Sequence, residues 1–218
     1  MRISELARVT GVPVPTVKYY LREGLLPQGT VTSRTQADYG DEHVRRLRLL
    51  RVLREVGDVP VGRLRDLVVA VEAEGLNTHD VLAAAAVALA PTPPPPGPAR
   101  DLARTLAEDL VTQAGWDHVA PDSPDRENLA AQLEAVIALG THDDKDPGLL
   151  LRYVEAVDSL AKWEIADLDD TAGPESVMQQ MVVGQVVFGE VLATLRRLAE
   201  EHYSAQRFRP ATSARRAR

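Results

Sequence analysis

Cysteine is absent from this 218-residue sequence. Disulfide bonds, thiolate metal sites and cysteine-ligated iron–sulfur clusters are therefore excluded. The longest uninterrupted apolar run, residues 81–90, is too short to cross a bilayer as a helix. The first residues mix apolar and charged side chains, unlike the apolar stretch of a signal peptide. We therefore expect a soluble, cytoplasmic protein that has no membrane partner.

Acidic residues outnumber basic residues in the chain as a whole, 32 to 25, and the resulting formal net charge of −7 argues against a nucleic-acid partner. The distribution along the chain reverses that argument. Residues 1–70 hold 12 Lys and Arg against 8 Asp and Glu, residues 71–206 hold 8 against 24, and residues 207–218 hold 5 against none. The three segments therefore carry formal net charges of +4, −16 and +5. A basic head on an acidic body fits a protein that binds phosphate at one end.

The stretch 14–26 has the pattern of a helix with two distinct faces. One face is apolar and consists of Val17, Tyr20, Leu21 and Leu25. The other face has two cations and an aromatic hydroxyl but no carboxylate, and consists of Pro15, Lys18, Tyr19 and Arg22. In isolation such a face is more often simply solvated. Beside suitable neighbouring elements, it favours docking on nucleic acid.

The neighbouring segments have the pattern of a winged helix-turn-helix. Residues 3–9 predict a short helix, and Gly11 supplies the tight turn into the helix at 14–26. Residues 28–39 are rich in Thr, Ser and Gly and predict a β-hairpin wing with Arg34 near its tip. Residues 41–57 predict a third helix with acids in its first turn. Its remaining surface is predicted to carry Arg45, Arg46, Arg48, Arg51 and Arg54.

The ordered motifs in residues 1–70 resemble the DNA-binding domain of the MerR family of transcriptional regulators. The matching segments are Arg2–Ala7, Thr10–Val12, Lys18–Tyr20, Glu23–Pro27, Tyr39 and Val44–Leu47. The ordered set is far more specific than any one segment. The resemblance implies a homodimer that binds a pseudo-palindromic promoter site in double-stranded DNA, with the second helix of each protomer in the major groove. It also implies that the promoter is bent and untwisted, which affects RNA polymerase indirectly.

The resemblance and the charged face together predict the residues that contact DNA. They are Thr16, Lys18, Tyr19 and Arg22 in the second helix, Arg34 in the wing and Arg45 in the third helix. The family usually has Arg at the position of Lys18, and Lys keeps the charge without the planar fork. The resemblance also implies dimerisation through a long coiled-coil helix after the head. At that place this sequence predicts only a short, Ala-rich helix, residues 77–90.

Proline divides the chain after residue 90. Residues 91–98, PTPPPPGP, cannot continue a helix and predict a semi-rigid linker. Helical periodicity resumes over 100–114, 123–139, 147–168 and 174–204, without strand-like alternation. We therefore predict a mainly α fold in four parts. These are a winged helix-turn-helix domain with a small β-hairpin wing (1–74), a short helix and Pro-rich linker (75–98), an all-helical effector or dimerisation domain (99–206) and a basic disordered tail (207–218).

Aromatic residues make up only 4% of the chain. Those that stand out in the second helical region are Trp116, Tyr153, Trp163 and Phe188. They either line a pocket for an apolar small-molecule effector or anchor the helical core. The last helix contains Gly184 and Gly189, although a Gly inside a helix costs about 1 kcal/mol relative to Ala. A kink, or a close helix contact in a dimer seam or within the domain, would offset that cost.

No group of residues in the sequence favours catalysis, a cofactor or a metal site. The acidic loop at 141–146 lacks the fixed spacing of a calcium loop. We therefore predict a DNA-binding regulator that is not an enzyme. Two forms of it remain open. In one, the C-terminal helices bind a small-molecule effector; in the other, there is no effector and these helices serve assembly or bind a protein partner.

Overall fold

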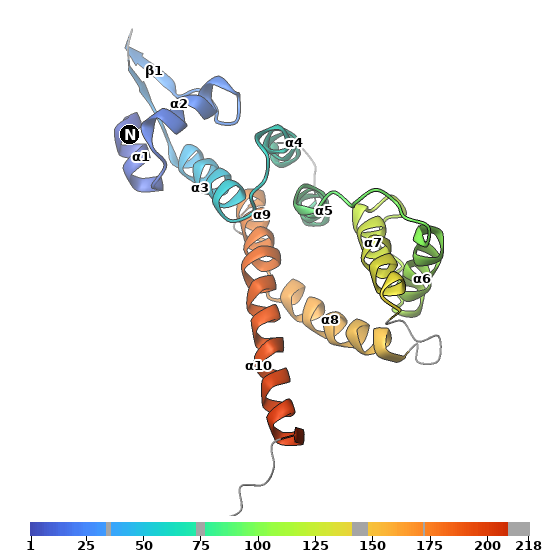
Figure 1. Ribbon diagram of the computed structural model, residues 1–218. Coiled ribbons are helices and arrows are strands. Elements are labelled where there is room, and N and C mark those ends of the chain that lie inside the picture. The colour runs from blue at the N-terminus through green and yellow to red at the C-terminus, as the bar shows by residue number, and fades with distance from the viewer. Residues whose placement is uncertain (34–35, 73–76, 141–147, 172, 209–218) are drawn as a thin grey trace, which may run out of the picture.

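The computed structural model of the protein describes residues 1–33, 36–72, 77–140, 148–171 and 173–208. The head contains α1 (Ile3–Thr10), α2 (Val14–Arg22), the hairpin β1 (Thr30–Ser33) and β2 (Gln36–Asp38), α3 (Asp41–Glu55), α4 (Val61–Glu72) and α5 (Thr78–Leu89) (Figure 1). After the linker come α6 (Arg100–Gln113), α7 (Pro124–Ala138), α8 (Gly148–Ala166), α9 (Pro174–Val182), the π-helix η1 (Val183–Phe188) and α10 (Gly189–Phe208). The predicted fold class, mainly helical with a small hairpin after the helix-turn-helix, is confirmed.

Gly11 makes the turn between α1 and α2, as the sequence predicts. Its φ of 71° lies in the left-handed region that a residue with a Cβ avoids. The turn is also held by Thr10, whose hydroxyl donates to the carbonyl oxygen of Leu6 at 2.8 Å and accepts from the backbone N–H of Val12 at 3.4 Å. These bonds fix the angle at which α2 leaves α1.

A Schellman motif ends α2. The N–H of Gly24 donates to the carbonyl oxygen of Leu21 at 3.4 Å, and the N–H of Leu25 donates to that of Tyr20 at 2.9 Å. Gly24 has a φ of 71°, which this motif requires at that position. The reversal turns Leu25 and Leu26 inward, where both are fully buried.

The wing is a short antiparallel hairpin in which Thr30 pairs with Asp38 and Val31 with Ala37. The start of the chain lies beside the residue that follows the wing. The amino group of Met1 donates to the carbonyl oxygen of Tyr39 at 2.8 Å, and the N–H of Tyr39 donates back to Met1 at 2.9 Å. Arg34, predicted near the tip, lies outside the described residues.

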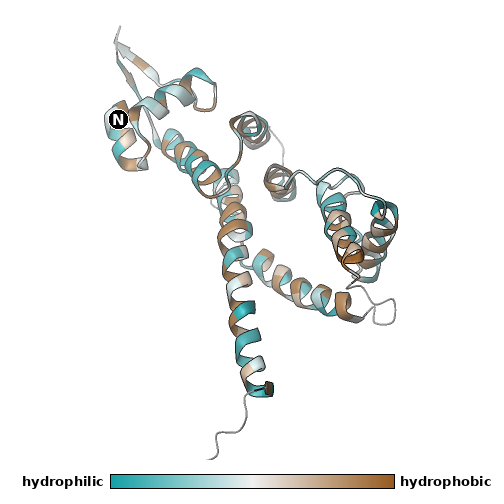
Figure 2. Ribbon diagram, in the orientation of Figure 1, coloured by the Kyte–Doolittle hydropathy of each residue, from teal (hydrophilic) through white to brown (hydrophobic). Residues whose placement is uncertain are grey.

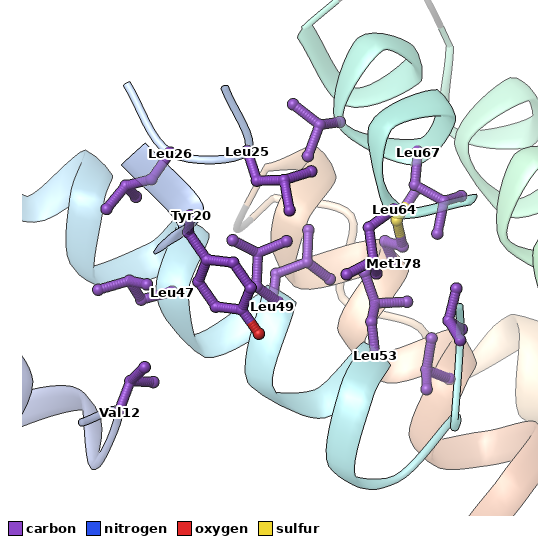
Figure 3. Close-up of a cluster of buried hydrophobic side chains, with 14 of the residues drawn as sticks. Val12, Tyr20, Leu25, Leu26, Leu47, Leu49, Leu53, Leu64, Leu67 and Met178 are labelled. Carbon is purple, nitrogen blue, oxygen red and sulfur yellow. The ribbon is translucent and has the colours of Figure 1, made fainter. Parts of the chain in front are cut away.

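The core of the head includes a helix from the far end of the chain. Leu47, Leu49 and Leu53 of α3 pack with residues of α2, α4 and α5, and with Met178 of α9 (Figure 3). Val177, Met178 and Val182 of α9 are at most 2% exposed. The sequence groups residues 99–206 into one domain, and that boundary stays a prediction. In the structure, α9 packs on α3 and α5.

The packing of α9 explains an error in the sequence analysis of α3. Arg46, predicted on the surface, is only 5% exposed. Its side of α3 faces α9 and the end of α4, where Glu175 and Glu72 supply carboxylates. Only an ion pair of this kind makes burial of a guanidinium tolerable. The sequence pattern shows one apolar stripe on α3, whereas the structure buries a wider surface.

The linker leads into a smaller helical unit formed by α6 and α7. Its core consists of Ala103, Ala107, Leu110, Ala130 and Leu133, with residues of α8 at its edge. The end of the linker is fixed, because the backbone N–H groups of Gly97 and Ala99 both donate to Glu134 at 3.2 Å. Arg100 is buried beside them and donates to Glu134 at 2.9 Å and to Glu127 at 2.7 Å.

The helix that starts at α9 extends far beyond the head. It passes through the π segment η1 and continues as α10, whose end lies at the opposite end of the molecule from α1 (Figure 1). Apolar and charged residues alternate along α10 (Figure 2). Gly184 lies in η1 and Gly189 begins α10, and neither has a heavy atom within 4 Å of the place where a Cβ would sit. No described neighbour in the protomer therefore approaches these two glycines closely.

Candidate nucleic-acid interface

The two faces that the sequence predicts for α2 are distinct in the structure. Val17 is 0% and Tyr20 is 6% exposed, and both belong to the core of the head. Lys18 and Arg22 are exposed, and Thr16 and Tyr19 are half-buried. The buried stripe therefore holds α2 in place while the other side of the helix presents its cations to solvent. These placements agree with the predicted contact residues, whose roles stay predictions.

Arg22 and Tyr19 form a unit on the exposed side of α2. The guanidinium carbon of Arg22 lies 5.3 Å from the centre of the Tyr19 ring, a cation–π distance. The Tyr19 ring also lies 5.9 Å from the Tyr20 ring in the core. The stack restricts the long Arg22 side chain, 72% of which remains exposed. A guanidinium held in this way loses less conformational entropy when it binds a phosphate.

Glu23 follows this unit and joins α2 to α4. Its carboxylate lies 3.6 Å from Nε of Arg22 and accepts a hydrogen bond from Nη2 of Arg65 in α4. The ion pair with Arg65 fixes the end of α2 against the fourth helix. The sequence gives no sign of this pair, because the two residues are 42 positions apart.

Arg2 connects the wing to α1. Its Nη1 atom donates to Oγ1 of Thr32 in β1 at 3.1 Å, and its Nε atom lies 3.8 Å from the carboxylate of Asp38 in β2. The angle of the wing thus depends on a residue that precedes α1. In the sequence Arg2 stands out only as part of the family motif, because Thr32 and Asp38 are 30 or more positions away.

The arginines of α3 divide into structural and exposed groups. Arg46 is buried, Arg51 donates to Glu55 at 2.8 Å and to the Thr10 carbonyl at 3.3 Å, and Arg54 donates to the Val59 carbonyl at 2.7 Å. Arg45 and Arg48 are exposed, and neither forms an ion pair within the described residues. Arg45 lies near the start of α3, just after the wing, and its predicted contact with DNA stays a prediction.

The four aromatic residues predicted to bind a ligand fall in two places. Trp163 and Phe188, 64% and 55% exposed, line one largely apolar hollow of about 400 Å³ between the end of α8 and the α9–η1 segment. Trp116 lies elsewhere and donates to Asp158 at 3.0 Å, and Arg196 lies over the ring of Tyr153. The structure therefore brings two of the four together, and ligand binding stays a prediction.

Metal ligands do not gather in the described parts of the chain, where no group of three His, Asp or Glu side chains could hold an ion. The acidic loop at 141–146 lies outside the described residues. The two tryptophans of the chain, Trp116 and Trp163, both lie within the residues that the structure describes.

Comparison with known proteins agrees with the geometry of the head. A family model described as MerR HTH family regulatory protein matches residues 1–69. The HTH-type transcriptional regulator HmrR of Sinorhizobium medicae is 29% identical over 130 residues, which cover 60% of this chain and 86% of that protein. Heavy metal-dependent transcription regulator 2 of Rhizobium meliloti is 28% identical over the same shares of the two chains.

A solved structure matches almost the whole chain. It is that of SCO5550 from Streptomyces coelicolor A3(2), which is assigned as a transcriptional regulator. It is 33% identical, with a TM-score of 0.71, over 95% of this chain and 98% of that one. The likeness therefore includes the helices after the linker. With its winged helix-turn-helix head and these relatives, the chain belongs to the MerR family of DNA-binding transcriptional regulators, which are not enzymes.

Proposed function

We propose that this protein regulates transcription as a cytoplasmic homodimer bound to a pseudo-palindromic promoter site in double-stranded DNA. The observation that carries the proposal is the exposed cationic side of α2, which lies opposite the buried side chains of Val17 and Tyr20. In this arrangement α2 of each protomer enters a major groove and the wing follows the backbone. Bending and untwisting of the DNA between the half-sites would change how RNA polymerase engages the promoter.

Each proposed contact residue has a distinct task. Lys18 and Arg22 bind phosphates or base edges, Tyr19 orients Arg22, and Thr16 makes a polar contact near the start of α2. Arg45 binds the backbone next to the wing. Arg34 is proposed from the sequence alone.

Footprinting of the purified protein on DNA upstream of its own gene tests this function. A symmetric protected region between the two promoter elements is the expected result, with enhanced cleavage at the centre where the DNA is distorted. Protection outside the promoter spacer would indicate that the protein represses transcription by steric block and does not distort the promoter. Absence of protection at low salt, with the protein shown to be folded by circular dichroism, would contradict regulation of its own gene. A genome-wide binding search would then test sequence-specific DNA binding itself.

We also propose that a small molecule modulates DNA binding through the hollow lined by Trp163 and Phe188. The hollow is lined mostly by apolar side chains, and its polar lining residues are Glu164, Asp167, Gln180 and Gln185. This composition suits a largely apolar ligand with a few polar or cationic groups. Its walls include α9 and η1, and α9 is part of the core of the head. A ligand there would therefore act on a helix that contacts α3 directly.

Ligand screening by melting temperature and tryptophan fluorescence tests the effector proposal. A ligand present at 100 times its Kd raises the stability of the protein by about 2.7 kcal/mol, which a melting curve resolves. A Trp163→Phe substitution should abolish the fluorescence response, while Trp116→Phe should keep it. If no compound gives a response, the alternative function is favoured, in which there is no effector and the C-terminal helices serve assembly or bind a protein partner. The metal named for the Rhizobium meliloti relative is not part of our proposal, because this chain has no cysteine for a thiolate site.

A further inference from the structure

The apolar residues of α10 form a seam that faces solvent. Val191, Leu195 and Leu198 of α10 are 43%, 57% and 57% exposed, and Phe188 at the end of η1, which begins the seam, is 55% exposed. Their spacings of three, four and three residues are those of the a and d positions of a coiled coil. Leu192 widens the seam on one side and is 45% exposed. α10 has 20 residues and a length of about 30 Å, and the same spacing continues after Leu198 with His202 and Ala205.

The helix α5 has no comparable seam, because its apolar side is used within the protomer. Val81 and Ala85 are 3% and 0% exposed, and they belong to the same core cluster as Met178 and Val182 of α9. α5 has only 12 residues, which is less than two heptads. Its one large apolar residue that is well exposed is Val87, at 56%. The chain's own α9 therefore occupies the side of α5 that a second protomer would need.

We propose that a second copy of this chain docks on the α10 seam, and that α5 takes no part in the dimer. The proposal rests on the proposed function in one respect, since a symmetric DNA site requires two heads. An interface with two-fold symmetry needs only one self-complementary surface, which a heptad seam provides. Gly184 lies four residues before Phe188, on the side of the helix that carries the seam, and the free space there allows close approach of a second helix.

A lipid bilayer is the other apolar environment that such a helix suits. The helix Pro174–Phe208 is long and apolar enough to cross a membrane by length and composition. However, its first part is the α9 segment, which the core of the head already buries. The second part, α10, carries six charged residues: Glu190, Arg196, Arg197, Glu200, Glu201 and Arg207. A bilayer would remove water from these charges, whereas a second helix covers only the seam and leaves most of them solvated.

Sedimentation equilibrium of the full chain and of three variants tests the proposal. Leu195→Asp places a charge at the centre of the seam and should weaken dimerisation roughly 100-fold or more, since a coiled-coil core excludes an unpaired carboxylate. Val87→Asp tests α5 in the same way and should leave the dimer unchanged. Leu102→Asp is the matched control, because Leu102 lies on α6 and is 62% exposed, like Leu195. Circular dichroism should show the same helix content in all four proteins.

Three results would overturn the proposal. They are a monomeric wild-type protein at micromolar concentration, a Leu195→Asp variant that dimerises like the wild type, and a Val87→Asp variant that becomes monomeric. A fourth result concerns the bilayer: the wild type would sediment with phosphatidylglycerol vesicles, Leu195→Asp would not, and neither would dimerise. That result would assign the seam to a membrane instead.

DNA binding by the same proteins separates this proposal from the function on which it rests. Leu195→Asp should bind a single half-site as the wild type does and should lose the additional affinity for the full site. If the wild type dimerises through α10 but binds no specific DNA, the dimer proposal stands and the proposed function fails. If Leu195→Asp binds the full site as tightly as the wild type does, the dimer proposal fails and the proposed DNA binding stands.

Discussion

The Nη2 atom of Arg46 lies 3.6 Å from Oε1 of Glu175, and this contact joins α3 of the head to α9 from the C-terminal half of the chain. The same guanidinium donates from Nη1 to Glu72 at the end of α4 at 2.8 Å. Arg46 is only 5% exposed. One buried cation therefore holds three helices together, so the position of α9 is electrostatically linked to the helix that follows the wing.

Removal of the charge at position 175 should destabilise the fold. Glu175→Gln leaves Arg46 with one charged partner instead of two, and we expect the free energy of unfolding to fall by about 1–2 kcal/mol. The effect stays below that of a fully broken buried pair, because Glu72 remains. Urea denaturation measures it. Glu190→Gln, an exposed substitution on α10, is the control and should change the stability by less than about 0.5 kcal/mol. Equal stability of the two variants would show that the contact with Glu175 contributes nothing.

A methyl group at Gly57 should separate α9 from the head. A Cβ there would lie 3.0 Å from the Leu53 carbonyl oxygen, 3.0 Å from Cδ2 of Leu89 and 3.3 Å from Cγ1 of Val182. Since three elements meet at this glycine, they cannot all move aside, and Gly57→Ala should cost about 1–3 kcal/mol. Gly62→Ala in α4 is the matched control, because no heavy atom lies within 4 Å of its Cβ position. That change should be neutral or stabilising by up to about 1 kcal/mol, as thermal melting will show.

The ion pairs of α6 and α7 predict a specific sensitivity to acid. Glu127 accepts hydrogen bonds from Arg104 Nε at 2.9 Å and from Arg100 Nη1 at 2.7 Å. These bonds, that of Arg104 first, lower the pKa of Glu127 from 4.5 to about 2. Because the pKa is lower in the folded protein, the stabilisation is present above pH 4.5 and is lost as the pH falls towards about 2.

Glu127→Gln should therefore flatten the pH dependence of stability. The variant should be less stable than the wild type at pH 7, and the difference should shrink as the pH falls from about 5 to about 2. Chemical denaturation at a series of pH values measures both curves. Asp109→Asn on the exposed side of α6 serves as the control and should keep the wild-type slope. A constant difference between Glu127→Gln and the wild type would mean that the ion pairs do not determine the acid response.

The sequence predicts the head well, because its information is local. Val17 and Tyr20 are buried and Lys18 and Arg22 are exposed, as a period of 3.6 residues requires. Gly11 takes the positive φ that its place between two helices demands. Such patterns depend on neighbours in the chain, so they can be read without knowing the tertiary structure.

The features that the sequence does not reveal depend on contacts between distant segments. In the sequence Arg46 looks like the other arginines of α3. Its burial depends on α9, whose Glu175 is 129 residues later in the chain. The π segment η1 (Val183–Phe188) has no sequence pattern that distinguishes it from an α-helix. The structure leaves Gly184 and Gly189 without close neighbours in the described protomer, which the sequence could not show, and the dimer seam stays a proposal.

Arg22→Ala gives the most direct test of the DNA interface. The guanidinium is stacked on Tyr19 and 72% of the side chain is exposed, so its loss should leave the fold intact. If Arg22 neutralises one phosphate, the slope of log K against log salt concentration should fall in magnitude by about 0.9 for each protomer. Fluorescence anisotropy with labelled operator DNA at several salt concentrations measures this slope. Arg152→Ala on the exposed side of α8 removes the same charge away from the head and should leave the slope unchanged. If Arg22→Ala weakens binding but keeps the wild-type slope, Arg22 reads a base edge through hydrogen bonds without releasing a counterion. If neither affinity nor slope changes, Arg22 does not contact DNA, and Lys18 and Arg45 become the residues to test.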